Sequence, residues 1–282
     1  MPLVNTPGSG RCFRVPGVRK KEDILTTQHV CHITGSVNAE PSCFHSWTWV
    51  REDFRAAFRW LLEHPDFDAE QLWKTRSKSV YKAVCPPELY SGPVAVKSYY
   101  EQRFLRYFLR GSLARREAEG YLRVQNLGIP TAEVLAYGER RTVWWLSSSF
   151  MITRFVEDTR NGSYFCRTCD GPGYGTPDMM VFCLKLMEML AQLHRNGCCH
   201  GGTHPRNFLW LGSGKEMRIV WIDLATVKSC PDPSLLAEKA AADLKAFFQP
   251  LGLSVEQKLE ALRKYEACNP AYSGATFENS FL

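Results

Sequence analysis

A lysine, an asparagine and an aspartate stand at the ends of short apolar runs, where a folded chain would hold their side chains in fixed positions. Lys97 ends the run Val-Ala-Val-Lys, Asn207 precedes Phe-Leu-Trp, and Asp223 follows four apolar residues. A lysine at the end of such a strand can pair with the α- and β-phosphates of a nucleotide. The amide oxygen of Asn207 and the carboxylate of Asp223 suit a hard divalent cation. These residue types predict phosphoryl transfer from a nucleotide, which relies on electrostatics and positioning. The alternatives are a solvent-exposed lysine and an aspartate that caps a turn.

Glu117 is the residue predicted to hold Lys97 in position. Tyr121 and Val124 follow Glu117 by four and seven positions, so they share its helical face, and this face must look inward. Glu119 is the less favoured candidate because it lies about 200 degrees round the helix from Glu117. The alternative for Glu117 is a surface carboxylate that pairs with a nearby arginine.

The segment from His200 to Asn207 has the layout of the loop that kinases place beneath the γ-phosphate. Gly202, however, occupies the position of the catalytic aspartate. His200, Gly202 and His204 are the predicted catalytic positions, and His204 is the candidate for orienting the attacking hydroxyl. Loss of a general base costs about 10²- to 10⁴-fold in rate, which is severe but leaves activity measurable.

The turn over residues 75–80 joins the first two predicted strands and contains no glycine. Turns that cover nucleotide phosphates are usually rich in glycine, because a glycine backbone can approach the phosphates closely. Ser77, Lys78 and Ser79 offer hydroxyls, amides and a positive charge instead. We therefore include these three residues among those predicted to bind the nucleotide.

The elements that must position these residues follow one another in a specific order. In chain order they are an amphipathic helix over 51–64, β-like runs over 71–75, 79–85 and 92–100, a helical region ending at Gly128, β-like runs over 132–139, 142–148 and 150–158, a helix over 179–194, two short strands around the turn 212–214, and helical residues 233–265. This order predicts an α+β chain with an N-terminal antiparallel sheet, one main helix beside it, and a mostly helical second half. We divide the chain into an irregular N-terminal extension (1–50), an N-lobe with its preceding helix (51–157), a C-lobe (158–270) and a tail (271–282).

The composition is that of a globular protein. With 282 residues, of which 45% are hydrophobic and 12% aromatic, the chain can bury one large core or two lobes. The longest apolar stretch is interrupted by charges and is well short of the roughly 20 residues of a membrane span. The N-terminus lacks the apolar core of a secretory signal, so we expect a cytoplasmic protein whose eleven cysteines are mostly thiols.

Two cysteine pairs raise the alternative of a metal or redox site. Cys166 and Cys169 form a Cys-x-x-Cys in a polar, Gly-rich segment, whereas Cys198 and Cys199 are adjacent. A single Cys-x-x-Cys supplies half of a zinc site, and an adjacent pair lacks the required spacing. We therefore favour thiols at these positions.

The most basic segment runs from Arg103 to Arg116 and holds five arginines. An amphipathic helix here would either contact the anionic headgroups of the inner membrane or simply cover the N-lobe sheet, and we favour the second. The net charge of +6 suits an anionic ligand or membrane surface without selecting between them.

Several pieces of the chain, taken in order, resemble a known family. They are VAVK, REAEGYLRVQNLGIPTAEVLAYGE, HGGTHPRNFLW, IVWIDLA and AADLKAFF. They look like the lipopolysaccharide core kinases, which act on heptose or Kdo sugars and have a bilobal, protein-kinase-like fold. The resemblance covers about residues 70 to 250, and the phrase LGIPTAEVLAYGE is also common in related small-molecule kinases, including aminoglycoside phosphotransferases.

The resemblance implies ATP and Mg²⁺ as cofactors and a sugar hydroxyl of the lipopolysaccharide core as acceptor, with no nucleic-acid partner. It implies that Lys97, supported by Glu117, binds phosphates, and that Asn207 and Asp223 hold magnesium. Asp243 matches a structural aspartate that braces the catalytic loop, and His204 falls near the transferred phosphate. The alternative function is a nucleotide-binding pseudokinase that serves as a regulatory or scaffold module in cell-envelope biogenesis.

Overall fold

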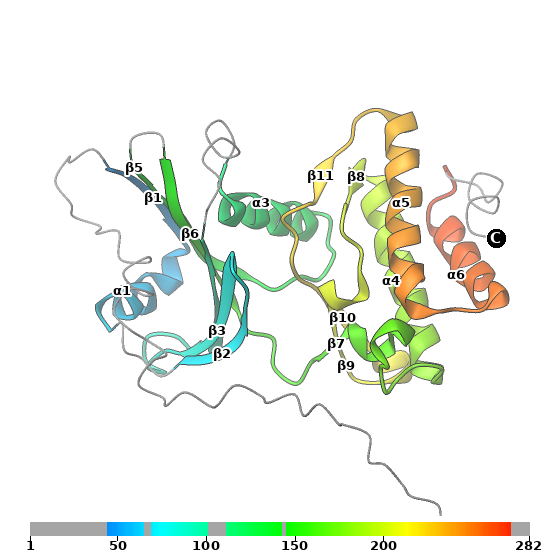
Figure 1. Ribbon diagram of the computed structural model, residues 1–282, viewed down its shortest axis with the longest axis horizontal. Helices are drawn as coiled ribbons and strands as arrows, with labels where there is room; N and C mark the ends of the chain where they lie inside the picture. Colours follow the sequence, from blue (N-terminus) through cyan, green and yellow to red (C-terminus); the bar gives the residue numbers. More distant parts are fainter. Residues whose placement is uncertain (1–43, 65–68, 101–110, 143–144, 272–282) are drawn as a thin grey trace, which may run out of the picture.

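The protein folds into a sheet-containing lobe and a mostly helical lobe (Figure 1). This computed structural model describes residues 44–64, 69–100, 111–142 and 145–271. Most of the predicted N-terminal extension, residues 101–110 of the basic segment and nearly all of the predicted tail lie outside these ranges.

Six antiparallel strands form the sheet of the first lobe, in the spatial order β1-β5-β6-β4-β3-β2. The strands are β1 (Phe44–Val50), β2 (Ala69–Lys74), β3 (Lys78–Val84), β4 (Pro93–Tyr99), β5 (Val134–Thr142) and β6 (Trp145–Arg154). The central pair β4 and β6 is in register with Lys97 opposite Met151.

Two sequence-based expectations for this sheet are wrong. Residues Phe44–Val50 belong to the sheet as β1, which pairs with β5, and not to an irregular extension. Their aromatic and β-branched residues favour a strand, but the Gly- and Pro-rich residues before them hide the pattern. The predicted runs 142–148 and 150–158 contribute to a single strand, β6, because Ser148 and Ser149 are buried within it and pair with β5.

Among the described residues, one helix covers each face of the sheet. Helix α1 (Arg55–Glu63), preceded by a short 3-10 turn, packs Phe58 and Leu61 against one face. Helix α3 (Leu113–Asn126) packs Tyr121 and Val124 against the other face and lies between the sheet and the second lobe (Figure 1).

Because both faces are covered, every residue of β4 is buried. Side chains alternate along a strand, so Val94 and Val96 belong to the α1 core, whereas Lys97 and Tyr99 point toward α3. A lysine is therefore placed inside the lobe, where it requires a partner.

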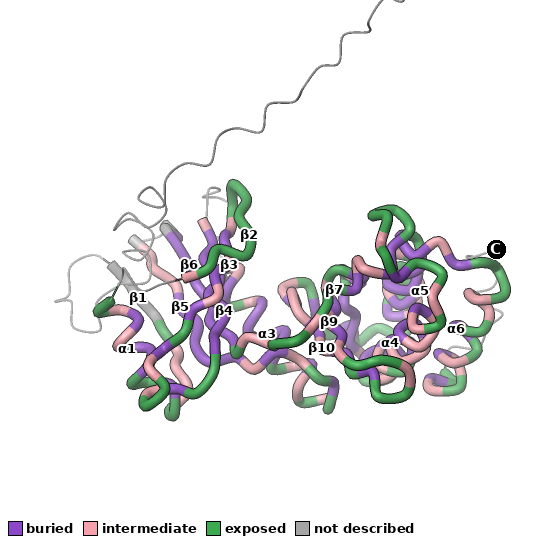
Figure 2. Tube along the Cα trace, turned by 90° about the horizontal axis from the view of Figure 1, so that it is seen from below, coloured by how far each residue is buried: buried purple, intermediate pink, exposed green. Residues whose placement is uncertain are grey.

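Three helices build the second lobe: α4 (Pro177–Arg195), α5 (Pro233–Leu251) and α6 (Val255–Cys268). The predicted helical region 233–265 is divided in two, because Gly252 ends α5 in the left-handed conformation (φ 65°) and Ser254 begins α6 with a capping box. Buried residues of these helices belong to the largest core, which also includes residues of α3 and of the first lobe's sheet. Figure 2 shows the buried segments of the second lobe in purple. None of the helices in the described ranges has the length and apolarity to cross a membrane.

Two small sheets face the first lobe. The first contains β7 (Arg160–Asn161), β9 (Phe208–Leu211) and β10 (Arg218–Trp221), in the order β10-β9-β7. The second pairs β8 (Cys198–Cys199) with β11 (Lys228–Ser229). The predicted loop 200–207 thus runs from β8 to β9, and Asp223 lies in the segment between β10 and β11.

Candidate active site

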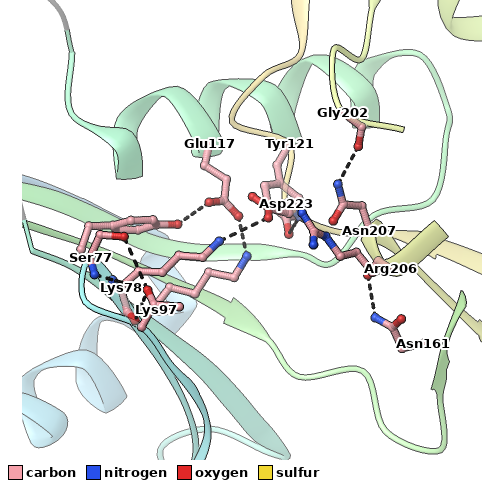
Figure 3. A network of polar contacts seen from close by, with 12 residues as sticks. Ser77, Lys78, Lys97, Glu117, Tyr121, Asn161, Gly202, Arg206, Asn207 and Asp223 are labelled. Atoms are coloured by element: carbon pink, nitrogen blue, oxygen red, sulfur yellow. Dashed lines mark hydrogen bonds and ion pairs between the residues drawn. The ribbon is translucent and has the colours of Figure 1, made fainter. Parts of the chain in front are cut away.

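Lys97 and Glu117 form a buried ion pair between β4 and α3 (Figure 3). Lys97 Nζ lies 2.5 Å from Glu117 Oε1, and the two side chains are 11% and 1% exposed. Tyr99 donates its hydroxyl hydrogen to the other oxygen of Glu117. Burial lowers the pKa of Lys97, but Glu117, Tyr121 and Asp223 outweigh this effect and the pKa is raised. Lys97 is therefore a fixed positive charge.

The rival candidate Glu119 lies on the exposed side of the same helix. It forms an ion pair with Arg115, four residues earlier, at 2.8 Å, and both side chains are about half exposed. Glu119 faces away from Lys97 because it lies about 200 degrees round the helix from Glu117, as expected from the sequence.

Asp223 adopts a left-handed backbone conformation with φ 59°. For a residue other than glycine this costs about 1–2 kcal/mol, a cost often found at functional sites. The backbone N–H of Asp223 donates to the Tyr121 hydroxyl at 3.2 Å. The carboxylate oxygen Oδ2 of Asp223 lies 3.2 Å from Lys78 Nζ. Burial raises the pKa of the carboxyl, but Lys97, Lys78 and His200 outweigh burial and lower the pKa below its ordinary value. Asp223 is therefore a carboxylate near two lysines.

Gly120 allows helix α3 to approach the segment that carries Asp223. A Cβ at Gly120 would overlap the carbonyl oxygen of Leu224. The contact between the two lobes at this point depends on this glycine, and it places Glu117 and Asp223 in one site (Figure 3).

The three residues of the glycine-free turn that were predicted to bind the nucleotide lie in different environments. Lys78 extends toward Asp223 (Figure 3). Ser79 is fully buried and its hydroxyl lies 3.0 Å from the Tyr100 hydroxyl, so it faces away from a bound phosphate. Ser77 is exposed, and the backbone N–H groups of Ser77 and Lys78 donate to Thr75 Oγ1 at 3.3 and 3.2 Å. A threonine hydroxyl therefore satisfies the amides that a glycine-rich turn would leave open.

Asn207 and Asp243 hold the loop that follows β8. Asn207 donates its Nδ2 hydrogen to the carbonyl of Gly202 at 2.6 Å, which leaves its amide oxygen as an acceptor. Asp243, on α5, accepts the backbone N–H groups of His200 at 2.7 Å and Gly201 at 2.8 Å. Thr203 also donates its hydroxyl to the Asp243 carbonyl oxygen. The loop is thus attached to α5 at three points.

A buried chain of polar residues supports Asp243 from behind. His194 Nε2 lies 3.2 Å from the Asp243 carboxylate, and His194 Nδ1 lies 2.8 Å from the Tyr265 hydroxyl. Asn269 donates to the same hydroxyl at 3.3 Å. Since a carboxylate only accepts, the neutral histidine carries its hydrogen on Nε2, and Tyr265 donates to Nδ1.

The His200 side chain is not accessible at the candidate site. Its side chain is fully buried beside Phe208 and Trp221, with ring centroids 5.7 and 5.3 Å away. Within the described residues neither ring nitrogen has a hydrogen-bond partner. Burial lowers the pKa of His200 to about 4 despite the neighbouring carboxylates. The predicted catalytic role conflicts with this burial, because a side chain with no exposed surface cannot touch a substrate in this conformation.

His204 caps the short 3-10 turn Pro205–Asn207 and is half-buried. Its Nδ1 accepts the backbone N–H of Arg206 at 3.2 Å. Burial and the Arg206 charge lower the pKa of His204, which favours the neutral ring. The hydrogen then lies on Nε2, so His204 can donate to a phosphate oxygen but has no free nitrogen to accept a hydrogen bond from a hydroxyl.

Two residues of the site were not predicted. Tyr99 contacts Glu117, and Tyr121 contacts the backbone of Asp223. Tyr99 lies two residues after Lys97 on the same strand face, and Tyr121 lies one helical turn after Glu117, so the spacing contained both signals. From the sequence, Tyr121 is predicted only to share the inward face of Glu117, and Tyr99 falls only within the predicted β-like run 92–100.

No group of three or more His, Cys, Asp or Glu side chains in the part of the chain that the structure describes is arranged to hold a metal ion. Cys166 is a buried thiol and Cys169 an exposed one. The pKa of the Cys166 thiol is raised to about 12, chiefly by burial.

Comparison with known proteins agrees with this architecture. The model of the lipopolysaccharide kinase (Kdo/WaaP) family matches residues 93–261, and no curated protein matches the chain. The structure of WaaP in complex with acyl carrier protein matches with a TM-score of 0.58 and 19% identity, over 78% of this chain and 89% of that chain. The kinase domain of Mycobacterium tuberculosis PknI matches with a TM-score of 0.40 and 18% identity, over 72% and 73%. The Rio2 kinase complex with ADP, Mg²⁺ and phosphoaspartate from Chaetomium thermophilum has a TM-score of 0.42 and 11% identity, over 75% and 73%. The protein-kinase-like α+β fold is confirmed, and the chain belongs to the lipopolysaccharide kinase (Kdo/WaaP) family.

Proposed function

We propose that this protein transfers the γ-phosphoryl group of ATP to a hydroxyl of a lipopolysaccharide core sugar. The observation that carries the proposal is the buried pair Lys97–Glu117, with Asp223 close enough to affect the lysine. Removing both charges from water costs several kcal/mol per ion. A scaffold has no chemical use for such a pair, whereas a kinase needs a fixed cation at the phosphates.

The residues at this site fit ATP with Mg²⁺. Lys97 and Lys78 supply positive charge for phosphates. Asp223 is a carboxylate with a lowered pKa, and Asn207 retains a free amide oxygen, both of which are ligand types that Mg²⁺ prefers. The ion, when bound, would neutralise charge on the phosphates. Lys78 would exchange its present contact with Asp223 for a phosphate.

The absence of an aspartate at Gly202 is compatible with this reaction. Phosphoryl transfer passes through a loose transition state in most analyses, so the attacking hydroxyl requires little early deprotonation. His204 would donate from Nε2 to the transferred group, and the remaining rate would come from positioning. The role of His204 is thus an electrostatic one, and the orienting role predicted from the sequence needs another group.

A second candidate function is a nucleotide-binding pseudokinase with a regulatory or scaffold role. Gly202 favours it, as does the turn of residues 75–80, whose amides are already satisfied by Thr75. The pair of Lys97 and Glu117 favours the kinase, since both residues would lack a chemical role in a module that performs no transfer.

Turnover of ATP with delipidated core oligosaccharide tests the proposal. The wild type is expected to form ADP and a phosphorylated oligosaccharide, detected by mass spectrometry. Asp223→Ala is expected to reduce turnover by at least about 100-fold, whereas Asp170→Ala, which removes an exposed aspartate with the same left-handed backbone, keeps it. Turnover that arises only in Gly202→Asp would support the pseudokinase. Unchanged binding of magnesium nucleotide in Asp223→Ala would contradict the assigned metal site.

A cytoplasmic location with peripheral contact at the inner membrane remains part of the proposal. Most of the basic segment that would make this contact lies outside the described residues. Sedimentation with anionic liposomes at low salt tests it, and an absence of binding there would contradict the membrane contact.

A further inference from the structure

The space beside Gly202 is partly filled by a neighbouring side chain. Gly202 is not among the glycines with positive φ, so its backbone does not require glycine. A Cβ at this position would lie 3.1 Å from Thr226 Oγ1, closer than ordinary van der Waals contact, and 3.7 Å from His200 Nδ1. The Thr226 hydroxyl therefore partly occupies the space that an aspartate side chain at position 202 would need.

The small sheet of β8 and β11 fixes this contact. Its register pairs Cys199 with Lys228, and continuing the register by two residues places Thr226 opposite Gly201. The turn that carries Thr226 is closed by a hydrogen bond from Val227 N to Leu224 O at 3.1 Å. Gly201, with φ 70°, would bring a Cβ within 3.4 Å of Thr226 Cβ. The two glycines of the loop allow Thr226 to approach it.

The Thr226 hydroxyl is available for a ligand. The residue is exposed, and its hydroxyl has no hydrogen-bond partner within the described residues. A threonine hydroxyl has two lone pairs and can accept a hydrogen bond. The two histidines of the loop cannot take this role, because His204 Nδ1 is occupied and His200 is buried.

We propose that Thr226 replaces the missing aspartate by accepting a hydrogen bond from the attacking sugar hydroxyl. This inference rests on the proposed kinase function. In the reaction, the sugar oxygen forms a bond to the γ-phosphorus as the bond to the β–γ bridging oxygen breaks, and ADP leaves with that electron pair. The hydroxyl proton passes to an oxygen of the transferred phosphoryl group and then to solvent. Thr226 keeps its own proton, so it orients the hydroxyl and does not act as a base.

Substitutions that remove only the hydroxyl test this role. Thr226→Val keeps the side-chain shape and should lower kcat about tenfold, the value of one hydrogen bond lost in the transition state. The KM for ATP should be unchanged, because the nucleotide does not touch Thr226 in this proposal. Thr226→Ser, which restores the hydroxyl, should recover most of kcat. Wild-type kcat in Thr226→Val would overturn the inference, and so would an equal loss in Thr226→Ser.

A double variant provides a second test of the same space. In Gly202→Asp the new carboxylate competes with Thr226 Oγ1, whereas Gly202→Asp/Thr226→Ala gives it room. The Gly202→Asp substitution should therefore raise kcat by a larger factor in the Thr226→Ala background than in the wild type. Equal ratios in the two backgrounds would show that the positions do not interact, and would overturn the inference. Failure of the proposed function is a different result: the wild type itself would bind nucleotide and phosphorylate no sugar.

Discussion

The two sides of the candidate site, which would bind the nucleotide and the acceptor under the proposed function, are built in opposite ways. On the nucleotide side, Lys97, Glu117 and Tyr99 are buried and bound to one another before any ligand arrives. On the proposed acceptor side, Gly202 offers no side chain, and Thr226 presents a hydroxyl that has no hydrogen-bond partner among the described residues. The charged groups of the nucleotide side are already paired with one another, whereas the acceptor side leaves a hydroxyl to which a substrate could hydrogen-bond.

Under the proposed function, the difference follows from what each side must recognise. A triphosphate has a fixed charge, and fixed protein charges bind it without reorganising. A sugar hydroxyl is neutral, and a neutral acceptor can orient it at a much smaller desolvation cost than a carboxylate. The acceptor side can therefore use a weaker group, provided that the nucleotide side holds the phosphates rigidly. Substitutions on the two sides should then differ in how much they change the free energy of unfolding.

The largest loss of stability is expected from Glu117→Ala, which removes one partner of the buried ion pair. The change leaves Lys97 buried without its counter-charge and removes the acceptor of the Tyr99 hydroxyl. Removing one partner of a buried pair costs about 3–5 kcal/mol. Urea unfolding measures this loss. Glu119→Ala, two residues away on the same helix, is the matched control and should cost at most about 0.5 kcal/mol. Similar losses in the two variants would mean that the Lys97–Glu117 pair is not buried in solution.

The nucleotide side was largely predictable from the sequence. The pairing of Lys97 with Glu117, and the exclusion of Glu119, follow from strand and helix periodicity, which are local properties. The same local reasoning failed at Phe44–Val50 and at Ser148, where the sheet decides the conformation. A strand at the edge of a sheet and a serine inside one are defined by their neighbours in the sheet, which are often distant in sequence.

The acceptor side was less predictable for the same reason. The sequence shows that an aspartate is missing at Gly202, but the contact with Thr226 depends on the register of β8 and β11 and is not local. His204 is the substitute expected from the resemblance, which places it near the transferred phosphate. Its hydrogen bond to the backbone of Arg206 shows that its free nitrogen is a donor.

A second prediction concerns His200, which lies beneath the acceptor side. Its pKa in the folded protein is about 4, below the ordinary value of 6.5. The unfolded chain therefore binds a proton first as the pH falls, so stability is complete above pH 6.5 and is lost progressively toward pH 4. Protonation of this one group in the unfolded chain would lower the free energy of unfolding by about 3 kcal/mol over that interval. Unfolding free energies between pH 7 and 4 should fall less steeply in His200→Phe than in the wild type. Parallel curves would mean that the folded protein protonates His200 and that water reaches the floor of the acceptor side.

The smallest predicted effect is a difference in stability between two substitutions at Asp223, where the two sides meet. Asp223→Ala and Asp223→Gly both remove the carboxylate and its contact with Lys78, so they differ only in how the backbone tolerates φ 59°. Glycine adopts this conformation freely, and the glycine variant should be more stable by about 1 kcal/mol, as measured by urea unfolding. The same pair of substitutions at Asp170 (φ 49°), which is exposed and outside the site, is the control and should show the same difference. If the difference appears at Asp170 but not at Asp223, the backbone at Asp223 relaxes once the carboxylate is gone. The strained conformation would then be imposed by the charges of the nucleotide side and not by the path of the chain between β10 and β11.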